Sequence, residues 1–188
     1  MSTPARPTIQ IIRHAEKPTD DPQTLGVDSS GNENPECLIP LGWQRAGALA
    51  TLFDPSRGTL APDLSAPQTI FAAGVGKHSN SHRPRETVKP LADKLGLKTN
   101  DSFLKGDETA MVDAVLAQTG VVLITWQHED IPGIANQILG NDTTVPQSWP
   151  GDRFDIVWVF TPDDSGAYAF TQVPQLLLAG DSAEVIEG

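Results

Sequence analysis

The fold of this chain is decided by the stretch Ile9–Pro18, which reads IQIIRHAEKP. Its isoleucines lead into Arg13 and His14, and from Glu16 onward the apolar pattern ends. A short β-branched run followed by turn-forming residues is typical of a buried strand that ends in a loop. The Arg-His pair is therefore predicted at the carboxyl end of a strand, the edge where open α/β sheets bind ligands.

Both members of this pair can do chemistry. An imidazole can act as a nucleophile, and a guanidinium presents a rigid fork of donors that suits the oxygens of a phosphoryl group. The pair can equally be structural, with His14 at the start of a loop and Arg13 paired with Glu16 or Asp20. The choice between these interpretations depends on the rest of the chain.

Length and composition limit the class of protein. A chain of 188 residues predicts one domain over residues 1–188 with a sizeable core. The net charge of −11 argues against nucleic acid or an anionic membrane surface as a partner. Cys37 is the only cysteine, so an intramolecular disulfide and a cysteine zinc site are excluded. We find no signal peptide pattern and no membrane-spanning stretch, and we expect a cytoplasmic protein.

Strands and helices alternate along the chain between loops at 18–36 and 54–67. The patterns predict helices over 38–53, 84–95, 109–118 and 133–139, and strands over 69–73, 97–104, 121–126, 155–160 and 167–173. The strand at 121–126 is continuously apolar and should be central, and turn residues 162–166 join the last two strands as an edge hairpin. We predict an α/β fold: a three-layer α/β/α sandwich whose mostly parallel sheet of about five or six strands carries helices on both faces.

Basic side chains gather between the second predicted strand and the helix that follows. Within nine residues the chain places five potentially cationic groups, namely Lys77, His78, His82, Arg83 and Arg85. The amino terminus of a helix adds further attraction for an anion. In a chain this acidic, the cluster favours an anion site over exposed charge. A second histidine, His128, follows the strand at 121–126 and would meet His14 in one crevice if the two strands are neighbours.

In this order and separation, these pieces resemble the histidine phosphatase superfamily, which has the phosphoglycerate mutase-like fold. That superfamily opens on a strand that carries Arg-His, usually followed by Gly, and here Ala15 stands in the place of the glycine. The helix opening at 41–46, LGWQRA, resembles the family pattern L-x-x-x-G-x-x-Q-A at Gly42 and Ala46.

Two further motifs carry the resemblance, which covers residues 8 to about 173. Ser79, Arg83 and Thr87 fit the family pattern Ser-x-x-x-Arg-x-x-x-Thr after the second strand, which gives Arg83 the role of the second phosphate arginine. His128 fits the second histidine, although both of its flanking residues depart from the glycine or serine that is common there.

The resemblance implies a mechanism. His14 would attack phosphorus and become a transient phosphohistidine. Arg13, Arg83 and His128 would surround the equatorial oxygens and neutralise the charge that develops on them. No metal or other cofactor is implied, because the cationic side chains take the place of Mg²⁺. The expected function is a metal-independent phosphatase that hydrolyses a small phosphorylated substrate.

A general acid must protonate the leaving alcohol and later activate water. Family members draw this acid from one of two places, which here correspond to Asp107 or Glu108 and to Glu129. We favour Glu108 slightly, and the sequence leaves the choice open. Lys17 and Arg85 are candidates for additional contacts with the phosphate.

Two other functions remain open at this point. One is a phosphoglycerate mutase-type phosphotransferase, for which the chain is short. The other is a non-catalytic protein that binds a phosphorylated ligand and acts as a regulator. The folds of the segments 18–36 and 141–153, which have no regular pattern, would determine the size and charge of the pocket.

Overall fold

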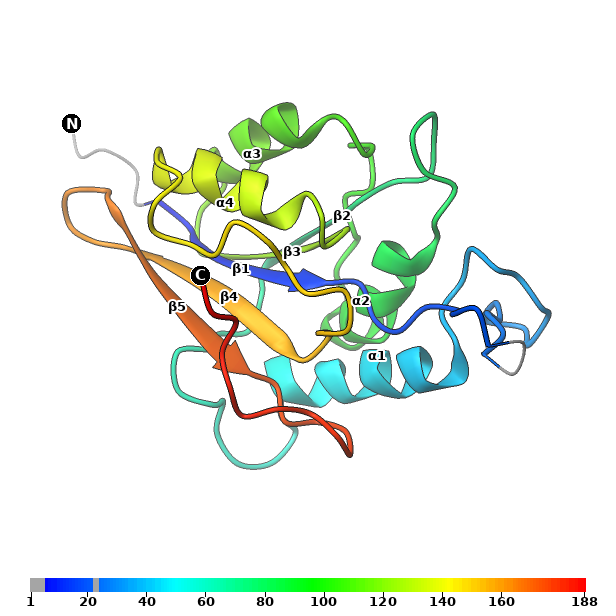
Figure 1. The fold of residues 1–188 in the computed structure, drawn as a ribbon. Helices are drawn as coiled ribbons and strands as arrows, with labels where there is room; N and C mark the ends of the chain where they lie inside the picture. The colour runs from blue at the N-terminus through cyan, green and yellow to red at the C-terminus, as the bar shows by residue number, and fades with distance from the viewer. Residues whose placement is uncertain (1–5, 22–23) are drawn as a thin grey trace.

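The computed structural model describes residues 6–21 and 24–188. Within them, one five-stranded sheet is covered by two helices on each face (Figure 1). The strands are β1 (Thr8–Arg13), β2 (Thr69–Ala72), β3 (Val121–Trp126), β4 (Ile156–Pro162) and β5 (Tyr168–Pro174). The helices are α1 (Pro40–Phe53), α2 (Arg83–Leu95), α3 (Glu108–Leu116) and α4 (Ile131–Leu139). Each lies within two residues of its predicted bounds.

The sheet is mixed, with the strand order β2-β3-β1-β4-β5. Strands β2, β3 and β1 are parallel, whereas β4 runs antiparallel to β1 and β5 antiparallel to β4. The α/β architecture is confirmed, but a mostly parallel sheet is confirmed only for these three strands. The segment 140–155 returns from α4 to the carboxyl edge of β1, so β4 starts there and runs back. The centre of the sheet is β1, and β3 lies beside it.

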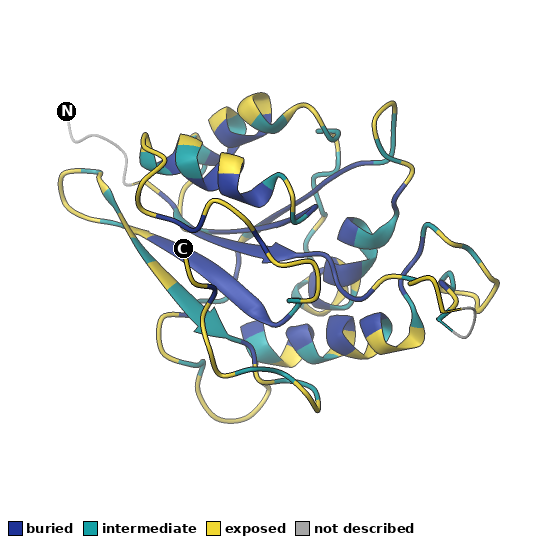
Figure 2. Ribbon diagram, viewed as in Figure 1, coloured by how far each residue is buried: buried dark blue, intermediate teal, exposed yellow. Residues whose placement is uncertain are grey.

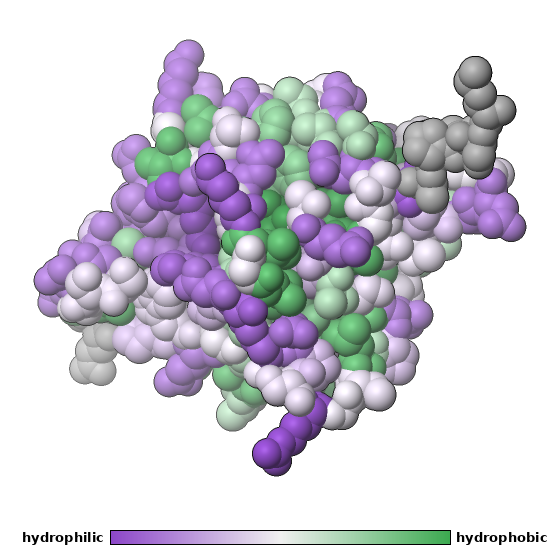
Figure 3. All heavy atoms as spheres, turned by 180° about the vertical axis from the view of Figure 1, so that it is seen from behind, coloured by the Kyte–Doolittle hydropathy of each residue, from purple (hydrophilic) through white to green (hydrophobic). Residues whose placement is uncertain are grey.

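Both faces of strands β1 to β4 are buried, which explains their continuous apolar runs, whereas the edge strand β5 is partly exposed (Figure 2). Successive side chains of a strand point to opposite faces. Ile11 therefore packs in the core under α3 and α4, and Ile12 packs in the core over α1 and α2. On the opposite side of the molecule, hydrophilic side chains surround a central band of apolar ones (Figure 3). No helix in the described ranges is long and apolar enough to cross a bilayer.

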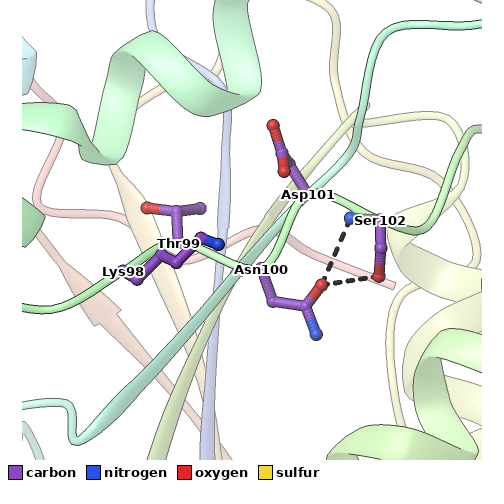
Figure 4. Close-up of a pocket in the computed structure, with 5 residues that line it drawn as sticks. All are labelled: Lys98, Thr99, Asn100, Asp101 and Ser102. Carbon is purple, nitrogen blue, oxygen red and sulfur yellow. Dashed lines mark hydrogen bonds between the residues drawn. The ribbon is translucent and has the colours of Figure 1, made fainter.

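The strand predicted at 97–104 is wrong. This segment makes only isolated bridges to Phe71 and Gly74, beside the outer edge of β2. The Asn100 side chain accepts hydrogen bonds from the backbone N–H (3.2 Å) and the hydroxyl (2.7 Å) of Ser102 (Figure 4). Such local bonds compete with a strand ladder. The five residues labelled in Figure 4 therefore line a polar surface hollow instead of extending the sheet.

Candidate active site

The carboxyl ends of β1 and β3 lie side by side. Their parallel register pairs Arg13 with Trp126, and the His14 N–H donates to the Trp126 carbonyl at 3.1 Å. His128 follows Trp126 by two residues. The topology thus brings the Arg13-His14 pair and His128 to one edge of the sheet.

His14 is buried, with 3% of its surface exposed. Its Nδ1 lies 2.7 Å from the Ala15 carbonyl oxygen. A carbonyl can only accept, so we assign the ring proton to Nδ1, and the neutral ring keeps its lone pair on Nε2. Burial lowers the pKa of His14 to about 3, and the positive charges of Arg13, Arg83 and Lys17 act in the same direction. At neutral pH the imidazole is therefore uncharged, the state that a nucleophile requires.

Arg13 is held by backbone carbonyls. Its Nη1 donates to Gly151 (2.7 Å), Arg153 (3.1 Å) and Pro150 (3.3 Å), and its guanidinium carbon lies 3.8 Å from the centre of the Phe154 ring. Nε and Nη2 are buried and have no hydrogen-bond partner among the described residues. Burial lowers the pKa of Arg13 to about 10, which leaves the group charged at neutral pH. Buried charged donors without partners suit an anionic ligand.

Arg83 opens α2 and is arranged similarly. Its Nη1 donates to the Pro35 carbonyl at 2.9 Å, Nη2 lies 3.9 Å from a Glu36 oxygen, and its buried Nε has no partner in the described part of the chain. The Thr87 hydroxyl donates to the Arg83 carbonyl and accepts from the Ala15 N–H, both at 2.8 Å. Thr87, four residues after Arg83, thus links the start of α2 to Ala15, which follows the candidate nucleophile His14.

His128 is part of a charged cluster at the same edge. Its Nδ1 lies 2.9 Å from a Glu129 oxygen, and the other Glu129 oxygen contacts Lys105. The contacts with His128 and Lys105 hold the pKa of Glu129 well below its usual range. The negative charge of Glu129 also favours the charged forms of Arg13 and Arg83. Glu129 is therefore ionised at neutral pH, near both arginines.

The other two candidate acids lie at the start of α3. Glu108 Oε1 accepts from Trp126 Nε1 at 3.0 Å and from the N–H two residues before it at 2.9 Å. Asp107 accepts from the Leu104 N–H at 2.9 Å within its own turn. Glu108 and Glu129 line one hollow of about 220 Å³, so these two carboxylates share a solvent space.

The two additional phosphate candidates differ in their surroundings. Lys17 is exposed, and its charge acts on His14. Arg85 Nη1 lies 3.0 Å from an Asp101 oxygen, and its Nη2 lies 2.9 Å from His82 Nδ1. Both terminal nitrogens of the Arg85 guanidinium thus already have partners in Asp101 and His82. Among residues 6–21 and 24–188, no three His, Cys, Asp or Glu side chains are placed to hold a metal ion.

No protein-family model matches the sequence, and a comparison with curated proteins gives no significant match. Solved structures do match. The putative phosphohistidine phosphatase SixA from Agrobacterium tumefaciens superimposes with a TM-score of 0.51 at 15% identity, over 87% of this chain and 97% of that one. A phosphoglycerate mutase from Plasmodium falciparum matches with a TM-score of 0.51 at 10% identity, over 97% and 99%. The chain has the phosphoglycerate mutase-like fold.

A third match to this fold is a phosphoserine phosphatase mutant from Entamoeba histolytica in complex with phosphoserine. It has a TM-score of 0.51 and 12% identity, over 88% of this chain and 95% of that one. At such identities the likeness establishes the phosphoglycerate mutase-like fold alone, and the reaction depends on the residues of the site.

Sequence reasoning missed several groups that this fold brings to the site. Phe154 precedes β4, and its place under Arg13 depends on the antiparallel pairing of β4 with β1, which no local pattern indicates. Lys105 lies in a predicted turn, and its contact with Glu129 spans two loops. The expectation that the segments 18–36 and 141–153 contribute to the pocket agrees with their carbonyl contacts to the arginines.

Proposed function

We propose that this protein is a phosphomonoesterase of the histidine phosphatase superfamily, in which His14 carries the phosphoryl group transiently. One observation carries the proposal: a buried, neutral imidazole with a free Nε2 lies beside two arginines that retain unpartnered buried nitrogens. The nucleophile and the anion donors are therefore present together. Preorganised donors of this kind stabilise the charge on a transferring phosphoryl group.

In the first step, the Nε2 lone pair forms a bond to phosphorus while the bond from phosphorus to the leaving oxygen breaks. The leaving oxygen takes a proton from the general acid. Nδ1–H keeps its hydrogen bond to the Ala15 carbonyl, which stabilises the positive charge that the imidazole acquires. Arg13 and Arg83 donate to the phosphoryl oxygens. In the second step, water forms a bond to phosphorus and gives a proton to the Glu108 carboxylate while the bond from phosphorus to Nε2 breaks. The electron pair of that bond returns to His14, and inorganic phosphate leaves.

Glu108 is the proton donor in this proposal. Glu129 is ionised because its pKa is held low, and this favours a charge-pairing role beside His128 over proton donation. Asp107 accepts a hydrogen bond in its own turn and does not line the hollow that Glu108 shares with Glu129. Loss of a general acid slows the release of a poor leaving group more than that of a good one. Glu108→Gln should therefore impair hydrolysis of an alkyl phosphate more than that of p-nitrophenyl phosphate, whereas Glu129→Gln should affect both alike.

The test of the proposed function is hydrolysis of p-nitrophenyl phosphate in the presence of EDTA, for the wild type and His14→Ala. Turnover that persists in EDTA and disappears in the variant supports a metal-independent histidine phosphatase. An acid-labile phosphoenzyme should form in the wild type alone. Equal activity of the two proteins would refute the role of His14. If both are folded but inactive, the non-catalytic binding protein is favoured, and dependence on 2,3-bisphosphoglycerate would indicate a mutase.

A further inference from the structure

Arg45 is a buried arginine on α1 that the proposed reaction does not use; 4% of its surface is exposed. Its Nε donates to Glu16 Oε1 at 2.8 Å, and its Nη2 lies 2.8 Å from the same oxygen. Nη1 and Nη2 donate to the two carboxylate oxygens of Asp181 at 3.1 and 2.7 Å, and Nη1 also donates to Gln175 at 3.0 Å. Arg45 thus connects the loop after His14 to the end of the chain.

The C-terminal segment, residues 175–184, is itself fixed to the sheet. Asp181 accepts a hydrogen bond from the Leu177 N–H at 2.7 Å in addition to those from the arginine. The Gln175 N–H donates to the Asp155 carbonyl at 2.7 Å, next to the start of β4. The Asp181 carboxylate is therefore held by the backbone of its own segment as well as by the Arg45 guanidinium.

A second connection runs from the C-terminal segment to the phosphate arginine. The Ser182 N–H donates to Asp155 Oδ2 at 2.6 Å, and Arg153 Nε donates to Asp155 Oδ1 at 2.7 Å. Arg153 Nη2 also donates to the Glu184 carbonyl at 2.6 Å. The backbone carbonyl of Arg153 accepts from Arg13 Nη1 at 3.1 Å. One of the three residues whose carbonyls hold Arg13 is thus held by the C-terminal segment.

We propose that the C-terminal segment, residues 175–184, is a brace that positions the reacting groups through two separate arms. The Arg45 arm fixes the loop that follows His14, and the Arg153 arm fixes one of the three carbonyls that hold Arg13. Arg45 and Arg153 are positioning residues, since neither has a direct part in the chemistry. This inference rests on the proposed function, because it concerns the same nucleophile and the same phosphate arginine.

The Arg45 arm is sensitive to small changes for a geometric reason. Glu16 stands two residues after His14, and 11% of its side chain is exposed. Both Asp181 oxygens accept from N–H groups, so an amide at this position would direct its own NH₂ toward a donor. A displacement of a reacting group by about 1 Å can reduce the rate about a hundredfold. Loosening this arm should therefore act on the attack by His14.

The Arg45 arm is tested with Asp181→Asn. On p-nitrophenyl phosphate we expect kcat to fall about tenfold, whereas inhibition by inorganic phosphate changes less than about threefold, because the phosphate arginines stay in place. Glu16→Gln should have the same effect, and the double variant no larger one, because both break one connection. The matched control is Asp93→Asn, which removes an exposed pair with Lys89 on α2 (2.8 Å) and should leave both constants unchanged.

The Arg153 arm is tested with Arg153→Gln. Its backbone carbonyl remains and still accepts from Trp149 Nε1 at 2.8 Å, but the side-chain contacts with Asp155 and Glu184 are lost. We expect KM and the phosphate inhibition constant to rise about tenfold, with a smaller change in kcat, because Arg13 binds the phosphoryl oxygens in the ground state as well as in the transition state. Phosphate affinity measured by titration calorimetry should weaken in parallel.

Several outcomes would overturn the brace. A lowered melting temperature with unchanged kcat and KM per folded molecule would make both arms purely structural. Equal effects of the two variants on kcat and on phosphate affinity would refute the division into arms. Failure of the proposed function has a different signature, since the wild type itself would lack turnover. The Arg45 arm would then be refuted with it, and the calorimetric affinities would decide the Arg153 arm.

Discussion

The buried imidazole of His14 should cost the folded state stability in mildly acidic solution. Its pKa is about 3 in the folded protein, against 6.5 for an ordinary histidine, because burial disfavours the charged ring. Between these two values the unfolded chain binds a proton that the folded chain does not, so the free energy of unfolding decreases as the pH falls. At about pH 4.5, two pKa units below the unfolded value, the loss relative to neutral pH is about 2.7 kcal/mol, at about 1.4 kcal/mol per unit.

The measurement is urea unfolding followed by tryptophan fluorescence at neutral pH and at about pH 4.5, for the wild type and His14→Gln. The wild type should lose about 2.7 kcal/mol more than the variant between the two conditions. Carboxyl groups titrate alike in both proteins, so their effects cancel in the difference. His78→Gln, which changes an exposed histidine, should retain the full wild-type loss. If the wild type and His14→Gln lose stability equally, His14 is not a buried neutral group and the argument for its Nε2 fails.

Three substitutions test other parts of the site. Arg13→Lys should reduce kcat/KM about a hundredfold and weaken phosphate binding in calorimetry, because an ammonium cannot keep the planar fork over Phe154. Phe154→Ala should raise KM about fivefold in steady-state kinetics, since it removes a cation–π contact of about 1 kcal/mol, and an unchanged KM would contradict this. Gly42→Ala should destabilise the fold by about 1–3 kcal/mol in urea unfolding, because a Cβ there would lie 2.6 Å from the Glu16 carbonyl oxygen. If that variant is as stable as the wild type, the loop that carries Glu16 can move away from the added methyl group.

The parts of the fold that follow local patterns could be predicted from the sequence. The isoleucines before Arg13 mark a buried strand, and α2 ends at Leu95 as predicted, where Gly96 takes a positive φ of 66°. The direction of β4 could not be predicted, because it depends on the path of the segment 140–155, which carries no periodic signal. In the segment 97–104 the predicted strand is reduced to isolated bridges at Asn100 and Leu104, and between them the Asn100 side chain bonds to Ser102.

The candidate site divides in the same way. Residue types at strand ends indicated the Arg13-His14 pair, and the neighbouring positions of β1 and β3 support the expected crevice with His128. Contacts between distant parts of the chain gave no sequence signal. Arg45 and Asp181 stand 136 residues apart, and only the folded core shows that their charges are buried together.

Arg13 and Arg83, the two arginines proposed to bind phosphate, are both anchored by backbone carbonyls. Arg13 is held by the carbonyls of residues 150, 151 and 153, and Arg83 donates to the carbonyl of Pro35. All four acceptors belong to the backbone, which every amino acid supplies. Apart from Arg153, whose side chain braces its own carbonyl, side chains in the two loops can therefore change while the arginine geometry stays the same. For the proposed phosphatase this means that one reaction centre is compatible with different loop side chains, and so with different phosphorylated substrates.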